Sequence, residues 1–155
     1  MKKKMNNKGF SLVELIIVVA IMVVLVGVLA PQYLRYVEQS RQSADLDNYD
    51  TIISAIEIWA ADPTHTWTNG TLTVEADGDV LATGSVQAAL VDAGIFTSTP
   101  GANPGDPATI TSNVTMRSAA FQDATIAVER DTTTGLYTYT FGATNGAALE
   151  TALGR

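Results

Sequence analysis

One carboxylate lies inside a long apolar run near the start of the sequence. Glu14 is followed by residues 15–30, which include no charged or strongly polar side chain. A charged side chain at the centre of a membrane-spanning helix costs about 2.5–3.5 kcal/mol by insertion scales, so it is by default a functional candidate. The position of Glu14 therefore calls for a positive partner.

A positive partner would arise if the chain were cut between Gly9 and Phe10. The new α-amino group of Phe10 would lie four residues before Glu14, one helical turn away, where the two charges can pair within one chain. The same amine can instead meet Glu14 of a neighbouring chain. Each subunit then offers one cation and one anion at staggered positions, a head-to-tail contact that does not close and so builds a helical filament.

The apolar run predicts a membrane-spanning helix. Residues 10–30 would form a helix about 31 Å long, enough to cross the hydrocarbon core of a bilayer. All four lysines of the chain lie before Gly9 and none follows the run. This asymmetry predicts that the N-terminus stays in the cytoplasm and that the remainder is exported.

Two other interpretations of this N-terminal segment are weaker. A secretory signal peptide has an apolar stretch of about 7–15 residues and then a small-residue cleavage site. Here the stretch is longer, and the candidate site at residues 28–30 is followed by Pro31, which fits poorly after a cut. A plain single-pass anchor fits the length of the stretch but does not explain Glu14.

Composition excludes several classes of function. The 155 residues allow one domain, and the absence of cysteine excludes disulfides, thiolate metal sites and cysteine nucleophiles. Removing the four lysines of the leader changes the net charge from −7 to −11, which disfavours nucleic acid as the main partner. The one histidine, His65, is expected to be an exposed loop residue. Glu75, Asp77 and Asp79 are expected to form a solvated turn rather than a calcium site, so we predict no catalytic residue, metal or cofactor.

Beyond Pro31 the pattern becomes amphipathic. Apolar residues recur every three or four positions, with acids and arginines between them. The helix is expected to end at Asp62-Pro63, because proline disfavours the helical conformation of the residue before it. The expected core face comprises Leu34, Val37, Leu46, Tyr49, Ile53, Ile56 and Ala60.

The remaining residues predict an antiparallel sheet of three or four strands laid on this helix. Asp77-Gly78 predicts a hairpin between residues 71–74 and 79–81. Ser85 is expected to cap a short helix over residues 86–93 that Gly94 ends, and residues 97–108 are expected to be a loop. Further strands are predicted near residues 110–118, 123–130 and 136–141, and in the last of these Tyr137, Tyr139 and Phe141 alternate onto one face. The tail, residues 142–155, is expected to form a helical turn or to fray.

The run from Lys8 to Glu14, with the apolar stretch and Pro31 after it, resembles the leader and N-terminal helix of bacterial type IV pilins and pseudopilins. The resemblance covers about the first 60 residues. It implies cleavage after Gly9 by a prepilin peptidase, N-methylation of Phe10, and pairing of Glu14 with the N-terminus of a neighbour. Pro31 matches the proline at which the family's helix kinks or unwinds, and Gly27 weakens the same backbone ladder four residues earlier.

The resemblance also implies the fold and the function. The expected fold is α+β: a leader (1–9), an apolar half of the helix (10–31), an amphipathic half (32–62) and a head (63–155) whose antiparallel sheet packs on the helix. The expected function is that of a subunit of an extracellular type IV pilus for adhesion and motility, which the subunit joins from the cytoplasmic membrane through an assembly platform and its ATPase. The alternative is a pseudopilin of a type II secretion or DNA-uptake machine. The absence of cysteine departs from the many pilins that have a C-terminal disulfide, so core packing alone must hold the head.

Overall fold

The computed structural model describes residues 10–99, 109–131 and 133–154. The chain divides into two units, residues 1–37 and residues 38–155, which are described separately below. Helix α1, Leu12–Ala61, contributes to both units. We call its residues 12–37 the apolar half, and we call the unit formed by residues 38–155 the head. The predicted leader, residues 1–9, lies outside the described residues.

Helix α1 ends at Ala61, as the Asp62-Pro63 pair predicted. The turn after it is held by Asp62, whose Oδ1 accepts hydrogen bonds from the backbone N–H and the hydroxyl of Thr64 at 2.8 and 2.7 Å. These two bonds hold the pKa of the exposed Asp62 carboxyl below its usual range. The polypeptide therefore leaves the helix through an ordered turn rather than by fraying.

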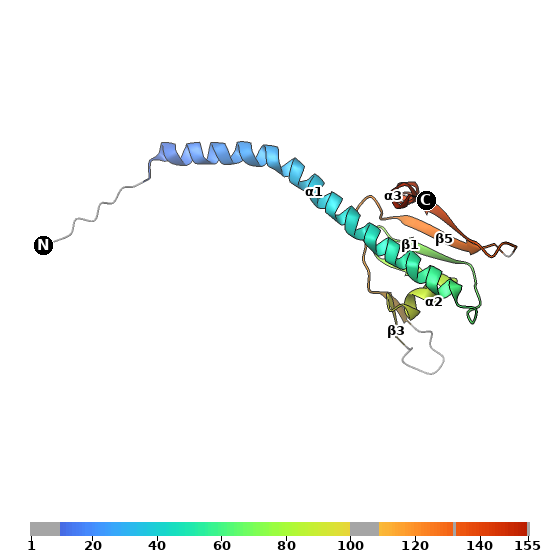
Figure 1. Ribbon diagram of the computed structural model, residues 1–155. Coiled ribbons are helices and arrows are strands. Elements are labelled where there is room, and N and C mark those ends of the chain that lie inside the picture. The colour runs from blue at the N-terminus through green and yellow to red at the C-terminus, as the bar shows by residue number, and fades with distance from the viewer. Residues whose placement is uncertain (1–9, 100–108, 132, 155) are drawn as a thin grey trace. The chain divides into compact units, whose positions relative to one another are not determined.

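The head contains a four-stranded antiparallel sheet, which confirms the predicted α+β fold (Figure 1). Its strands lie in the order β2-β1-β5-β6. Residues 97–99, expected in a loop, instead belong to a separate two-stranded sheet in which β3 pairs with β4. The strand bounds are β1 Gly70–Val74, β2 Val80–Ala82, β3 Phe96–Thr99, β4 Thr109–Ser112, β5 Ala124–Arg130 and β6 Tyr137–Ala143.

The predicted hairpin is present, and its turn requires Gly78. In the β1–β2 hairpin Val74 is paired with Val80, and Gly78 has a φ of +91°. A Cβ at this position would also overlap the carbonyl oxygen of Met116, which packs directly on the turn. Glycine is therefore needed both for the backbone conformation and for the close approach of the segment after β4.

The core of the head forms where one face of α1 meets the sheet. Tyr49, Ile53 and Ile56 are buried as predicted, whereas Leu34 is 67% exposed and so was wrongly assigned to the core. Ile52, which the sequence analysis did not select, has no exposed surface. On β6 the predicted alternation of aromatic residues is confirmed, because Tyr137, Tyr139 and Phe141 are partly buried and pack against this core.

Two short helices flank the sheet and correct two predictions. Helix α2, Gly84–Asp92, has Thr83 at its N-cap position without a side-chain cap; the Ser85 hydroxyl instead accepts the backbone N–H of Thr68 at 2.7 Å. Gly94 follows the helix with a φ of +73°, as expected. The tail forms a complete helix, α3 (Gly146–Leu153), which is anchored by the fully buried Leu149.

Candidate functional site

The sequence placed the chemistry at the N-terminus of α1, and the structure orients the Glu14 carboxylate there. Glu14 lies in the first turn of the helix, and its Oε2 accepts a hydrogen bond from the backbone N–H of Ser11 at 2.9 Å. This is one half of a capping box, in which an acid at the third helical position satisfies a backbone donor before the helix. The Ser11-x-x-Glu14 spacing is the sequence signal for this bond.

The bonded Glu14 oxygen faces the chain start, next to Phe10. Phe10 directly precedes the Ser11 donor and is 91% exposed. Among the described residues no hydrogen bond is made by Oε1, the second oxygen of Glu14. Gly9 lies outside the described residues. One carboxylate oxygen is therefore engaged within the chain, while the other is placed to accept a further donor.

The positive end of the helix dipole reinforces this arrangement. Acidic side chains in the first helical turn are stabilised by the unpaired backbone N–H groups of that turn. Glu14 is the acid found in the first turn of α1. The site can therefore hold a carboxylate in an apolar segment and present it to a cation.

The apolar half of α1 presents large side chains around its whole circumference. From Leu12 to Leu29 the large apolar residues are 47–74% exposed. The helix is long and apolar enough to cross a membrane, by length and composition. A helix that is apolar on all sides requires an apolar environment, either lipid or other copies of the same helix.

Gly27 and Pro31 lie within an unbroken helix. Helix α1 continues through both residues in the described chain. Pro31 cannot donate to the carbonyl of Gly27, the residue one turn earlier, so one helical hydrogen bond is missing there. A Cβ on Gly27 would meet nothing within 4 Å, so packing within the described residues does not explain this glycine. Unwinding at these two residues stays a prediction.

His65 differs from its prediction as an exposed loop residue. Its ring stacks on Trp59 with centroids 4.1 Å apart and planes 9° apart, and its Nδ1 lies 3.1 Å from the Trp59 carbonyl oxygen. The side chain is consequently half-buried. It supports the end of α1 and makes no contact that indicates catalysis.

The acidic hairpin turn is held by hydrogen bonds within the turn. Asp77 Oδ1 accepts the backbone N–H of Asp79 at 3.1 Å, and Glu75 accepts that of Gly78 through its carbonyl at 2.9 Å. No cluster of three or more metal-binding side chains occurs among the residues that the structure describes.

One buried carboxylate, Asp45, was not predicted from the sequence. It is 1% exposed and accepts the backbone N–H groups of Arg117 and Ser118 at 2.9 and 2.6 Å. The Ser118 hydroxyl donates to Glu38 at 2.7 Å. Asp45 lies four residues before the core residue Tyr49 and thus on its face, which is the signal that could have identified it. These contacts attach the segment between β4 and β5 to α1.

Comparison with known proteins agrees with this N-terminal site. The family model for the prokaryotic N-terminal methylation motif matches residues 4–30. The type IV major fimbrial protein FimA of Dichelobacter nodosus is 37% identical over 99 residues. The match covers 59% of this chain and 62% of the relative, so the chain spans about three fifths of that protein's length. No solved structure matches.

Proposed function

Because its N-terminal motif and its fimbrial relative both favour a type IV pilin, we propose that the chain is the repeating subunit of an extracellular type IV pilus. The leader is removed between Gly9 and Phe10 by a prepilin peptidase, and Phe10 is then N-methylated. The apolar half of α1 holds the subunit in the cytoplasmic membrane and afterwards packs in the centre of the filament. The fibre serves adhesion and twitching-type motility, and the protein is structural rather than enzymatic.

The single observation that carries this proposal is the geometry of Glu14. Its Oε2 is held by the Ser11 N–H at 2.9 Å, so the carboxylate points towards the chain start. In a filament the Phe10 amine of an adjacent subunit would supply the missing cation. The pair would be isolated from water by the exposed apolar side chains around it, where a lone carboxylate is unfavourable.

The subunit reaches the fibre from the membrane. The basic leader keeps the N-terminus in the cytoplasm, while the head is exported. The partners are further copies of the chain, the peptidase, and an assembly platform with its ATPase. The similarity to a major fimbrial protein favours a pilus over a secretion or DNA-uptake pseudopilus.

Replacement of Glu14 tests the proposal. The variant Glu14→Ala should still be inserted and cleaved, because its apolar segment becomes more hydrophobic, yet it should not polymerise without the native copy. Breaking a buried ion pair costs about 3–5 kcal/mol, and this cost recurs at every subunit. The membrane pool and the surface fibres would be compared by immunoblot and electron microscopy. Glu14→Asp, which keeps the charge, is the matched control and should retain some fibres, whereas wild-type fibre numbers from Glu14→Ala would contradict the proposal.

A further inference from the structure

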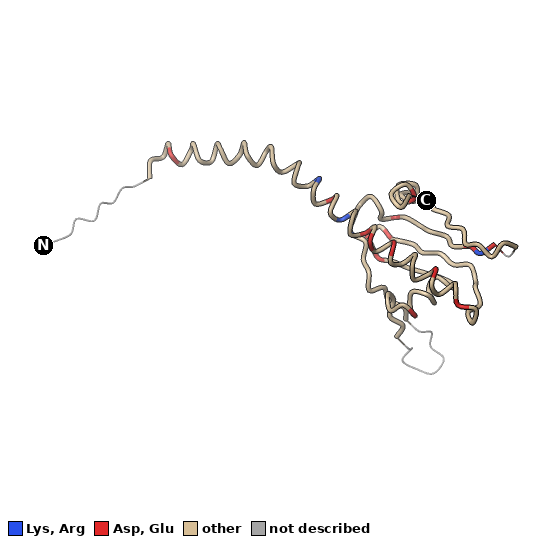
Figure 2. Tube along the Cα trace, in the orientation of Figure 1, with Lys and Arg blue, Asp and Glu red and all other residues tan. Residues whose placement is uncertain are grey.

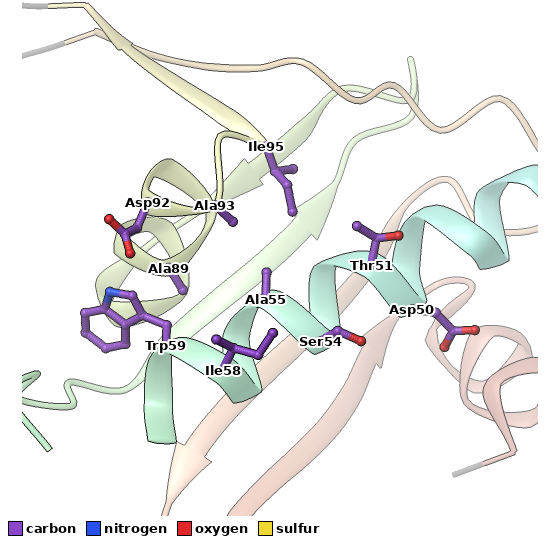
Figure 3. Close-up of a pocket in the computed structure, with 10 residues that line it drawn as sticks. All are labelled: Asp50, Thr51, Ser54, Ala55, Ile58, Trp59, Ala89, Asp92, Ala93 and Ile95. Carbon is purple, nitrogen blue, oxygen red and sulfur yellow. The ribbon is translucent and has the colours of Figure 1, made fainter. Parts of the chain in front are cut away.

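An apolar groove with acidic ends lies in the head between α1 and α2. Its volume is about 670 Å³, within the range of binding clefts in proteins (Figure 3). Its lining includes Asp50, Ser54, Ile58 and Trp59 of α1 and Asp92 of α2.

The lining favours a cationic occupant with an apolar body. Asp50 and Asp92 are the ionisable residues of the lining, and Figure 3 shows them at opposite ends of the groove, with the Trp59 indole near Asp92. Ile58 is 75% exposed and its side chain faces the groove. Stacking on His65 holds the Trp59 ring in place. An arginine supplies a charge for a carboxylate at either end, and its apolar stem can lie along the groove.

The chain itself offers one arginine with matching surroundings. Among the described arginines, Arg41 and Arg117 line another hollow in their own head. Arg130 lies over the ring of a tyrosine in its own sheet, 5.9 Å from the centroid. Arg35 is exposed and forms no ion pair with any described residue.

The residues around Arg35 supply the apolar body. Tyr33, Leu34 and Tyr36 are 68%, 67% and 70% exposed. They directly follow the predicted membrane span, where tyrosine and arginine suit the boundary between lipid and water. A subunit that leaves the membrane for a filament loses this boundary, so the exposed segment from Tyr33 to Tyr36 then requires a new apolar cover.

We propose that the groove between α1 and α2 of one subunit receives the segment Tyr33–Tyr36 of a second copy, with Arg35 facing the Asp50 carboxylate. The inference rests on the proposed filament and specifies its second contact. For parallel helices, pairing residue 35 with residue 50 shifts the copies by about 22 Å, whereas pairing Phe10 with Glu14 shifts them by about 6 Å. The two contacts therefore join a subunit to different neighbours along the fibre.

Cysteine cross-linking tests this contact, because the native chain contains no cysteine. Fibres of the double variant Tyr36→Cys, Ser54→Cys should yield a ladder of covalent oligomers after oxidation, since each subunit contacts the next copy through unlike positions. Each single variant should yield no ladder. The matched control pairs Tyr36→Cys with Thr138→Cys, an exposed position on β6, and should also yield none. Normal fibres of the test pair without a ladder would overturn the inference and leave the filament intact.

Charge reversal gives a second readout if the cysteine variant does not assemble. Arg35→Asp or Asp50→Arg should each lower the fibre yield at least about tenfold, and the combined variant should restore it. The controls Arg41→Asp and Asp47→Arg make the same charge changes elsewhere on α1 and should have smaller effects. Single variants that match the wild-type yield, or a combined variant without recovery, would overturn the pairing. Absence of the wild-type chain from surface fibres would instead refute the proposed function itself.

Discussion

The two halves of α1 are one continuous helix with opposite exposure. Large apolar side chains from Leu12 to Leu29 are 47–74% exposed, whereas Tyr49 and Ile52 in the second half are 0% exposed. Glu14 is the acid of the apolar half, and Figure 2 shows further acidic positions along α1 within the head. Both halves are α-helical, and apart from the bond missing at Pro31 the difference between them lies in what covers the side chains. The head supplies its own cover, and the apolar half depends on lipid or on other copies.

Retention of the leader should have the largest effect, and this effect should fall on the apolar half of α1 and not on the head. Gly9→Val should block cleavage, because a small residue is expected at the cut position, and should abolish fibres while the head still folds. Mass spectrometry of the membrane fraction would show the uncut chain, and electron microscopy would show no fibres. Gly27→Val places the same change inside the apolar half and should leave cleavage intact. Normal processing of Gly9→Val would show that the cleavage site has been misassigned.

Matched isoleucine truncations separate the two halves energetically. Ile52→Ala should destabilise the head by about 2–5 kcal/mol, because it leaves a cavity at a fully buried site. Ile21→Ala should leave head stability unchanged, since Ile21 is 55% exposed and belongs to the other unit. Thermal unfolding of both full-length variants in detergent, followed by near-ultraviolet circular dichroism, measures the difference. Equal losses of head stability in the two variants would contradict the division of the chain into two units.

The buried carboxylate of the head should matter less than a core isoleucine but more than a surface acid. Asp45→Ala leaves the Arg117 and Ser118 N–H groups without their acceptor and should cost about 2–3 kcal/mol. Asp47→Ala, an exposed acid two residues later, should change stability by less than about 0.5 kcal/mol. Urea unfolding of residues 36–155, which should be soluble and monomeric, gives both values.

The smallest expected effect concerns alkaline pH. Burial, and next the charge of Asp45, raise the pKa of Tyr49 above its ordinary value of 10.0. Tyr49 thus keeps its proton in the folded head while the unfolded chain loses it, so its contribution to stability is complete below about pH 10 and falls as the pH rises further. The head contains no lysine, so tyrosines dominate titration there. Urea unfolding at rising pH should show a shallower alkaline loss in Tyr49→Phe, and identical slopes would contradict this assignment.

Local signals in the sequence predicted the parts of the fold that local chemistry determines. Asp62-Pro63 predicted where α1 ends, and Asp77-Gly78 predicted the hairpin, because both act through their own backbone conformations. The core register was predicted in part: Tyr49, Ile53 and Ile56 share one helical face.

The missed features depend on partners distant in sequence. Ser85 was expected to cap α2, but its hydroxyl binds Thr68, 17 residues earlier. Asp45 is buried because backbone donors 72 and 73 residues later reach it. Helix α3 forms because Leu149 packs in the core of the head. At the candidate site, the sequence predicted the importance of Glu14. Its hydrogen bond with the Ser11 N–H was not predicted, although the Ser-x-x-Glu spacing of a capping box indicates it.

Mass spectrometry of fibres sheared from the cell surface tests the central claim most directly. The account predicts that the subunit recovered from wild-type fibres begins at Phe10, carries a methyl group on that α-amine, and ends with the intact head. Deleting the gene for the chain provides the control and should remove this peptide together with the fibres. A subunit that begins at any other residue, or fibres that persist without the chain, would contradict the account.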